Sequence, residues 1–586
     1  MRKSLALTYI CSVFFFPIYH GLAAQTANSQ TGANAPATKP EDLCALAGRV
    51  VNAATNEPVN KVAVTLTRTN PTPGVAGLPR QFGTSSDASG RFAMKDLEPG
   101  TYRLQVSRNG FVTAEYGARS PSSPGTPLTL SRAQQPQDLV IRMTPHAVVS
   151  GRIVDQDGEP VASVMVQLLK LQYAQGKKRL QTAGSAQTND LGEYRAFGLA
   201  PGKYYISAGM VLTAAAAALT EDKSAEPRPE ESDVTTYYPG VTDSAAATPV
   251  DVTAGVQLRG IDMTLARRRT ARIRGRVNAP APASMLILAP RSLAGALSMQ
   301  MVRVDPKGEF DIHGVAPGSY ALSGSVQQSG KTYLASLPID VGQSDIEGLT
   351  LSIVPGVVVA GRVRVDGETK ADLANVKVQM QPHEMGIGAL MSAMGSVMSG
   401  GGIGANSGKL AADLSFQLEN TSADRYDVTV TGLPEGFYVK SIRSGDDDVL
   451  LQGLEVEGAA PEPLDILVSP HAGQVTGSVQ NPTTQQPAAQ AIVALVPQEK
   501  DRRDQPSFYR QVSSDASGGF TFKSLPPGQY KVFAWEDVES GAWMDPDFIK
   551  PLEDKGEAVT LAESGQESVQ VKLIPAGAPP AKPNGQ

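Results

Sequence analysis

Residues 87–106 read DASGRFAMKDLEPGTYRLQV. The first four, DASG, favour a turn, because aspartate starts turns through its side chain and glycine accepts a positive φ. The aromatic Phe92 then begins a short strand, and Pro99-Gly100 suits the two central positions of a type II turn. The last segment, 102–106, alternates apolar and polar residues, which is typical of a strand with one buried face.

The same pattern recurs along the chain with a fixed internal spacing. In each copy, a tyrosine stands ten residues after the aromatic that follows the turn. The aromatic and tyrosine pairs are Phe92 and Tyr102, Tyr194 and Tyr204, Phe310 and Tyr320, and Phe520 and Tyr530, with a blurred copy, PEGFY, at 434–438. We expect the repeated tyrosine to send its hydroxyl back to a nearby backbone group, as a tyrosine corner does.

A second motif, glycine followed in most copies by arginine and then an aliphatic residue, precedes each turn. Its copies begin at Gly48, Gly151, Gly275, Gly361 and Gly477. This spacing of about one hundred residues is domain-sized. The sequence therefore predicts an all-β tandem array of about five β-sandwich domains. The links between them are short and several begin with proline, so we expect a semi-rigid rod.

The three motifs together resemble carboxypeptidase regulatory-like domains, over nearly all of residues 43–575. They are the Gly-Arg-Val start at 48–50, the Asp-x-x-Gly-x-Phe turn at 87–92 and the Pro-Gly-x-Tyr strand at 99–102. The resemblance implies an immunoglobulin/prealbumin-like (transthyretin-like) sandwich, classed with the carbohydrate-binding-like fold, and an accessory, adhesive or sugar-binding role. The fourth copy departs most, because it lacks a clean Asp-x-x-Gly turn.

The N-terminus has the features of a secretory signal peptide. Arg2 and Lys3 precede an apolar run, and small residues at Gly21 and Ala23 suit cleavage after Ala23. An uncleaved membrane anchor is the alternative interpretation of this segment. We therefore expect a secreted, periplasmic or cell-surface protein with no membrane span after signal removal. The predicted ranges are 1–23 signal peptide, 24–42 disordered leader, 43–145 sandwich 1, 146–268 sandwich 2 with an Ala-rich and charged insertion, 269–355 sandwich 3, 356–470 sandwich 4 with a Met- and Gly-rich insertion, 471–575 sandwich 5, and 576–586 disordered tail.

Cysteine usage and charge restrict the function classes. After cleavage Cys44 is the sole cysteine, so no internal disulfide can form, and we interpret Cys44 either as a buried residue or as the point of an intermolecular bridge. A formal net charge of −6 gives no basic surface for nucleic acid. We expect no nucleic-acid partner.

We find no residue pattern that indicates catalysis. The five histidines are scattered and do not form the spacing of a zinc site or a catalytic triad. Carboxylates at 155–158 and 446–448 could hold calcium, but turn chemistry explains the first group equally well. We therefore predict that the protein is not an enzyme, and we predict no metal and no cofactor.

Aromatic side chains that the alternation directs away from the cores are the candidate ligand-binding residues, because sugar rings stack on exposed flat apolar faces. The candidates are Phe533, Trp535, Trp543, Tyr205, Tyr237 and Tyr238. A structural role, covering a sandwich edge or sealing a joint between domains, is the alternative for these residues. We predict an exported noncatalytic binding or adhesion protein at the cell envelope, with a polysaccharide or glycan as its partner. The alternative function is a structural spacer or a scaffold for an envelope or extracellular protein.

Overall fold

The computed structural model describes residues 43–69, 80–118, 125–132, 138–174, 176–209, 231–283, 285–291, 299–328, 331–354, 356–367, 372–383 and 406–576. The predicted signal peptide, nearly all of the predicted leader and tail, and most of the two insertions lie outside the described residues. The described chain is all-β, which confirms the predicted fold class. Within the described ranges, no helix has the length and apolar character needed to cross a membrane.

Five main hydrophobic cores follow one another along the chain, and we name the units around them sandwiches 1 to 5. Their outer boundaries stay a prediction. Sandwich 1 contains β1 (Cys44–Asn52), β2 (Ala63–Arg68), β3 (Gln81–Ser85), β4 (Arg91–Leu97), β5 (Gly100–Ser107), β6 (Ala114–Glu115), β7 (Leu128–Leu130) and β8 (Leu139–Met143). Sandwich 2 contains β9 (Ala147–Val154), β10 (Met165–Ala174), β11 (Lys177–Gln187), β12 (Glu193–Leu199), β13 (Gly202–Gly209), β15 (Thr236–Tyr237), η2 (Ser244–Ala246), β16 (Val250–Val252), β17 (Gln257–Leu258) and β18 (Met263–Thr264). The two strands β14 (Glu231–Val234) and β19 (Ala266–Arg269) pair with each other between sandwiches 2 and 3.

The next two units repeat this architecture. Sandwich 3 contains β20 (Ala271–Asn278), β21 (Met285–Pro290), β22 (Gln300–Arg303), β23 (Glu309–Val315), β24 (Gly318–Gln328), β25 (Lys331–Val341) and β26 (Ile346–Ser352). Sandwich 4 contains β27 (Val357–Val365), β28 (Lys377–Pro382), β29 (Asn406–Lys409), β30 (Ser415–Thr421), β31 (Asp424–Thr431), β32 (Tyr438–Ser444), β33 (Asp447–Asp448), α3 (Val449–Gln452), β34 (Leu454–Val456) and β35 (Leu464–Ser469).

Sandwich 5 differs because its two layers join into one curled sheet in the order β38-β37-β40-β42-β36-β39. The parallel pairing of β40 with β42 makes the join. Its elements are β36 (Gly473–Gln480), β37 (Ile492–Pro497), α4 (Lys500–Arg503), η4 (Pro506–Phe508), β38 (Arg510–Ser513), β39 (Gly519–Leu525), β40 (Gly528–Trp535), η5 (Ala542–Met544), α5 (Pro546–Ile549), η6 (Lys550–Lys555), β41 (Glu557–Leu561) and β42 (Gln566–Ile574).

The sequence motifs meet inside each unit. In sandwich 5, a Cβ on Gly477 would stand 2.2 Å from the carbonyl oxygen of Val569 in β42 and 2.5 Å from Cζ of Phe520 in β39. The equivalent glycines, Gly48, Gly151, Gly275 and Gly361, each lie against the backbone of the last strand region of their own sandwich. Glycine recurs here because no side chain fits between the first strand and the last.

The predicted tyrosine corner is confirmed in three copies. The hydroxyls of Tyr102, Tyr204 and Tyr530 donate to the backbone oxygens of the residues four positions earlier, at distances of 2.7, 2.6 and 2.9 Å. The predicted type II turn before these tyrosines is wrong: Gly100 has φ 158°, close to extended, and already begins β5.

In sandwich 4, the copy of the motif expected at 434–438 is wrong. The equivalent tyrosine is Tyr426 in β31, whose hydroxyl lies 3.0 Å from the oxygen of Ser422, and it stands ten residues after Phe416. Leu414 takes the positive φ, 62°, that glycine has in the other copies. Sequence comparison missed this copy because Ala411 and Leu414 replace the turn aspartate and glycine.

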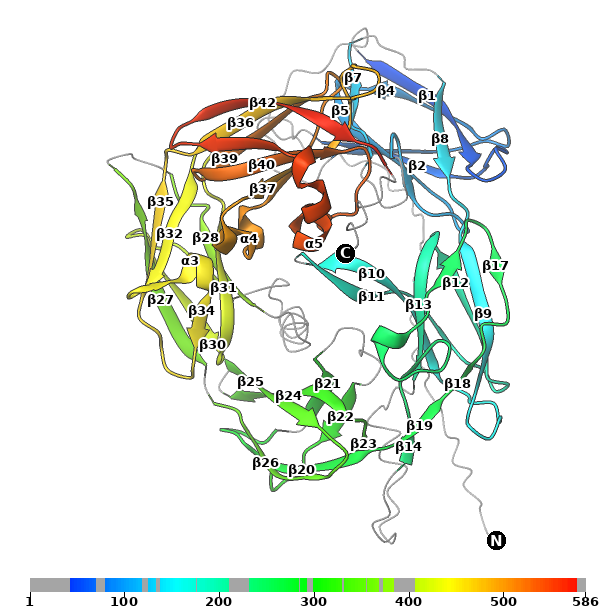
Figure 1. The fold of residues 1–586 in the computed structure, drawn as a ribbon, viewed down its shortest axis with the longest axis vertical. Helices are drawn as coiled ribbons and strands as arrows, with labels where there is room; N and C mark the ends of the chain where they lie inside the picture. Colours follow the sequence, from blue (N-terminus) through cyan, green and yellow to red (C-terminus); the bar gives the residue numbers. More distant parts are fainter. Residues whose placement is uncertain are drawn as a thin grey trace, which may run out of the picture.

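The expected rod is also wrong. Figure 1 shows the sandwiches following one another around a closed circuit, so that sandwich 1 lies beside sandwich 5. Short links are compatible with a straight array or a curved one. Polar contacts such as Lys440 to Glu563, 2.9 Å, brace the joint between sandwiches 4 and 5. Contacts between residues far apart in the sequence then close the circuit.

Candidate functional site

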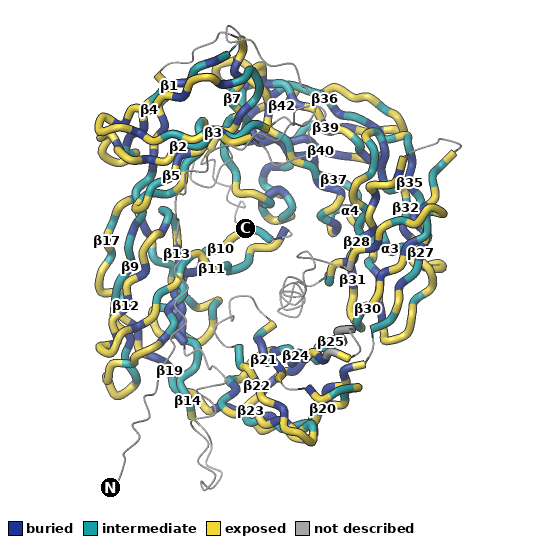
Figure 2. The backbone as a smooth tube through the Cα atoms, turned by 180° about the vertical axis from the view of Figure 1, so that it is seen from behind, coloured by how far each residue is buried: buried dark blue, intermediate teal, exposed yellow. Residues whose placement is uncertain are grey.

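The aromatic candidates of sandwich 5 come together, but they are not exposed. Phe533, Trp535 and Trp543 are exposed by 0, 2 and 3%, so the expectation of an open sugar-stacking face is wrong. The alternation along β40 is as predicted, since Val532 and Ala534 enter one core while Phe533 and Trp535 enter another. Figure 2 shows β37 and β40 buried along most of their length.

The second core exists because residues 536–556 fold back over the outer face of β40. We call this segment, which contains η5, α5 and η6, the cap. Phe533 and Trp535 stack with ring centroids 5.5 Å apart, and Trp543 of the cap lies 6.3 Å from Trp535. Nε1 of both tryptophans is buried without a hydrogen-bond partner among the described residues.

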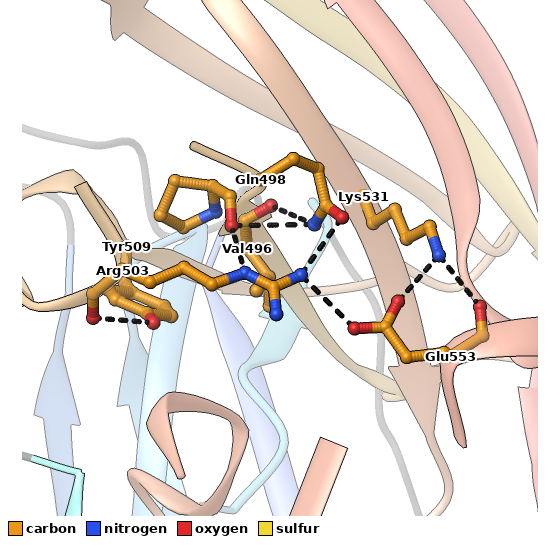
Figure 3. Close-up of polar contacts among 7 residues, drawn as sticks. Val496, Gln498, Arg503, Tyr509, Lys531 and Glu553 are labelled. Atoms are coloured by element: carbon orange, nitrogen blue, oxygen red, sulfur yellow. Dashed lines mark hydrogen bonds and ion pairs between the residues drawn. The ribbon is translucent and has the colours of Figure 1, made fainter. Parts of the chain in front are cut away.

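A polar network anchors the cap to the sheet (Figure 3). Arg503 donates from Nη2 to Gln498 Oε1 at 2.9 Å and to Glu553 Oε1 at 3.1 Å. Lys531 of β40 donates to Oε2 of Glu553 at 2.5 Å and to its backbone oxygen at 3.0 Å. Partial burial raises the pKa of Glu553, but the hydrogen bonds from Lys531 and Arg503 outweigh this effect and hold the pKa below its ordinary value.

The three tyrosine candidates lie apart from these residues, in sandwich 2. Tyr237 is 6% exposed, and Tyr238 packs against the core of the same sandwich. Burial raises the pKa of Tyr237, and the charge of Asp243 adds to that rise. Tyr205 is partly buried on β13. The expectation of an exposed aromatic side chain is therefore wrong for Tyr237, while Tyr205 and Tyr238 are partly buried.

A cavity of about 870 Å³ lies where sandwich 1 meets sandwich 5. Its size falls within the usual range of ligand pockets, roughly 300 to 1,000 Å³. Trp543 is part of its wall, so one predicted residue does lie at the cavity. The side chains in the wall that can form hydrogen bonds include Gln105, Tyr116, Arg142, Gln490, Gln511 and Ser540.

The cavity wall mixes polar and apolar residues and has no strong net charge. Arg142 and Glu115 contribute one charge of each sign, and both have partners: Arg142 donates to Asn56 Oδ1 at 2.8 Å, and Glu115 accepts from the backbone of Gly125 at 2.9 Å. The remaining polar groups are amides and hydroxyls, which can both donate and accept hydrogen bonds. This chemistry suits a neutral ligand rich in hydroxyl groups.

Sequence reasoning missed the part of the cavity that sandwich 1 provides. Gln105 stands on the polar face of β5, as the alternation predicted, but nothing in the local pattern indicates that this face meets sandwich 5. Gln490 and Gln511 lie on the other side of the cavity, about four hundred residues away in sequence. Only the closure of the circuit brings these groups together.

Cys44 and the two carboxylate groups have structural roles. Cys44 is 2% exposed and its thiol donates to the backbone oxygen of Ser131 at 3.0 Å, which confirms the buried-residue interpretation over the intermolecular bridge. Asp155 accepts from the backbone N–H groups of Asp157 and Glu159, and Asp448 caps α3. The described residues contain no group of three or more His, Cys, Asp or Glu side chains that could hold a metal.

Comparisons with known proteins give one family match. The family model of the carboxypeptidase regulatory-like domain matches residues 45–144. No curated protein matches the chain. The resemblance of sandwiches 2 to 5 to the same family stays a prediction.

Solved structures similar to the chain include one protein named TIE and two pilins. The Bacillus anthracis TIE protein is 10% identical with TM-score 0.15, and covers 73% of this chain and 74% of its own. The Streptococcus agalactiae minor pilin GBS52 is 12% identical with TM-score 0.20, and the match covers 39% of this chain and 97% of the pilin. The Bacillus cereus major pilin BcpA is 8% identical with TM-score 0.15, and the match covers 73% of this chain and 99% of the pilin. Similarities this low carry no functional argument. What the comparisons do establish is that residues 45–144, in sandwich 1, match the carboxypeptidase regulatory-like domain.

Proposed function

We propose that the protein is an exported, noncatalytic carbohydrate-binding protein of the cell envelope, and that the cavity between sandwiches 1 and 5 is its binding site. The observation that carries the proposal is the cavity wall, to which Gln105 of sandwich 1 and Gln490 and Gln511 of sandwich 5 all contribute. Amide groups match the mixed donors and acceptors of sugar hydroxyls.

The near-neutral wall favours neutral glycans over uronic acids or sulfated sugars. Arg142 already donates to Asn56, and Glu115 lies 4.0 Å from Arg103. An anionic sugar would therefore meet one cation that is already hydrogen-bonded, Arg142, and one carboxylate that repels it, Glu115. The buried Trp543 serves as wall rather than as a stacking platform, because its ring is 3% exposed.

The test is titration calorimetry of the full protein against a panel of neutral and acidic oligosaccharides. We expect saturable binding to neutral members and weaker binding by the double variant Gln105→Ala, Gln511→Ala. Each lost hydrogen bond contributes about 0.5–1.5 kcal/mol, so the pair should reduce affinity roughly tenfold. The matched control is Gln81→Ala, an exposed glutamine of sandwich 1 that is not among the lining residues.

Two outcomes would count against the proposal in different ways. Glycan binding that the double variant leaves unchanged would remove the cavity as the site. Absence of binding across the whole panel would remove carbohydrate as the ligand class and would favour the alternative, a spacer or a scaffold for another envelope protein.

A further inference from the structure

The hairpin formed by β10 and β11 leaves sandwich 2 and reaches the cap of sandwich 5 (Figure 1). Tyr173, near the end of β10, contacts Phe548 of α5 edge to face, with ring centroids 6.2 Å apart. At the hairpin turn, a Cβ on Gly176 would stand 2.9 Å from the backbone oxygen of Met544. Two elements some 370 residues apart in sequence are therefore in direct contact.

The cap contacts the cavity on one side and the hairpin on the other. On one side it contributes Val538, Ser540 and Trp543 to the cavity wall. On the other side the hairpin covers it, since a methyl group on Gly541 would stand 3.4 Å from Cβ of Tyr173. Within six residues of the cap, positions that line the cavity thus alternate with positions that contact the hairpin. A shift of the cap at the hairpin therefore also shifts the cavity wall.

Charge complementarity supports the same contact. Lys170 and Lys178 of the hairpin lie close enough to Glu539 of the cap to influence its ionisation. Burial raises the pKa of Glu539, and a hydrogen bond from the backbone of Tyr173, followed by the charges of the two lysines, partly offsets this rise. Lys178 also stands over the ring of Tyr173, with Nζ 5.1 Å from the ring centroid, in a cation–π contact.

We propose that the β10–β11 hairpin is a positioning element of the cavity, and that docking of Tyr173 on Phe548 holds the cap where it completes the cavity wall. This inference depends on the proposed function only for the identity of the ligand that the cavity binds. The hairpin acts through the cap, so ligand binding and hairpin docking stabilise each other.

The test compares Tyr173→Ala with Tyr173→Phe, which keeps the ring, and with Gln172→Ala, an exposed neighbour on β10. Hydrogen exchange of the full protein reads the cap directly, without any ligand. We expect Tyr173→Ala to accelerate exchange in residues 536–549, while Tyr173→Phe and Gln172→Ala leave it at the wild-type rate. Slow exchange elsewhere in sandwich 2 shows that the variant is folded.

The coupling between hairpin docking and ligand binding is measured by titration with the oligosaccharide that binds the wild type most tightly. We expect Tyr173→Ala to weaken binding roughly 3- to 30-fold, with Tyr173→Phe restoring it. Unchanged exchange in Tyr173→Ala would overturn the docking, and unchanged affinity despite faster exchange would overturn the coupling. A wild type that binds no glycan would count against the proposed function alone, because the exchange experiment still decides the docking.

Discussion

Cζ of Phe92 lies 2.8 Å from the position that a methyl group on Gly48 would occupy, and the carbonyl oxygen of Leu139 lies 2.5 Å from the same position. A side chain there must displace backbone as well as a buried ring. Gly48, within the first strand of sandwich 1, thus allows that strand, the turn aromatic and the last strand to lie in close contact.

Replacement of this glycine is therefore expected to destabilise sandwich 1. Gly48→Ala should reduce its free energy of unfolding by about 1–3 kcal/mol, the usual cost of overpacking. The control is Gly83→Ala in β3, where a Cβ would meet nothing within 4 Å. Urea unfolding followed by hydrogen exchange of β1 and β8 measures both variants, and equal stability of the two would contradict this account.

The buried tyrosines predict a loss of stability at high pH. Burial, the largest cause, raises the pKa of Tyr204, Tyr509 and Tyr530 to about 12. A raised folded-state pKa gives stability that is complete below the unfolded value, about 10, and is lost as pH rises through the folded value. Thermal melting temperatures should therefore fall between pH 10 and 12. Spectroscopic titration should show a class of tyrosines that ionise late, and uniform ionisation near pH 10 would contradict their burial.

Both tryptophans are expected to be shielded from solvent. Since Trp535 and Trp543 are exposed by 2 and 3%, their fluorescence should be blue-shifted and should resist quenching by iodide. Tyr173→Ala should increase the quenching of Trp543 by loosening the cap. Efficient quenching in the wild-type protein would mean that the cap does not cover β40.

Local features of the fold could be predicted because they depend on neighbouring residues. Phe92, Tyr102 and their counterparts identify turns and half-buried strands through alternation and spacing alone. The exposure of Phe533 and Trp535 was wrongly predicted because the alternation gives the face of a side chain but not what covers that face. Here the cover is the cap, an irregular segment without a strand or helix period.

The closed circuit and the cavity could not be predicted from the sequence, because they depend on contacts between residues that are distant in sequence. Whether five sandwiches form a rod or a circuit depends on contacts such as Tyr173 with Phe548, and no local pattern marks either residue as a partner of the other. The cavity follows from this closure, so Gln105 and Gln511 could not be recognised as neighbours. Trp543 was selected as an aromatic candidate, and its position at the cavity comes from the cap.

The closed circuit also changes how strong the contact between sandwiches 1 and 5 must be. Because the two are already tethered through sandwiches 2 to 4, their meeting is an intramolecular event governed by an effective concentration rather than by the amount of protein in solution. Such tethering removes most of the entropy penalty that two free domains would face. A contact too weak to hold separate domains together can therefore keep the circuit shut, and a small change at one joint can open it.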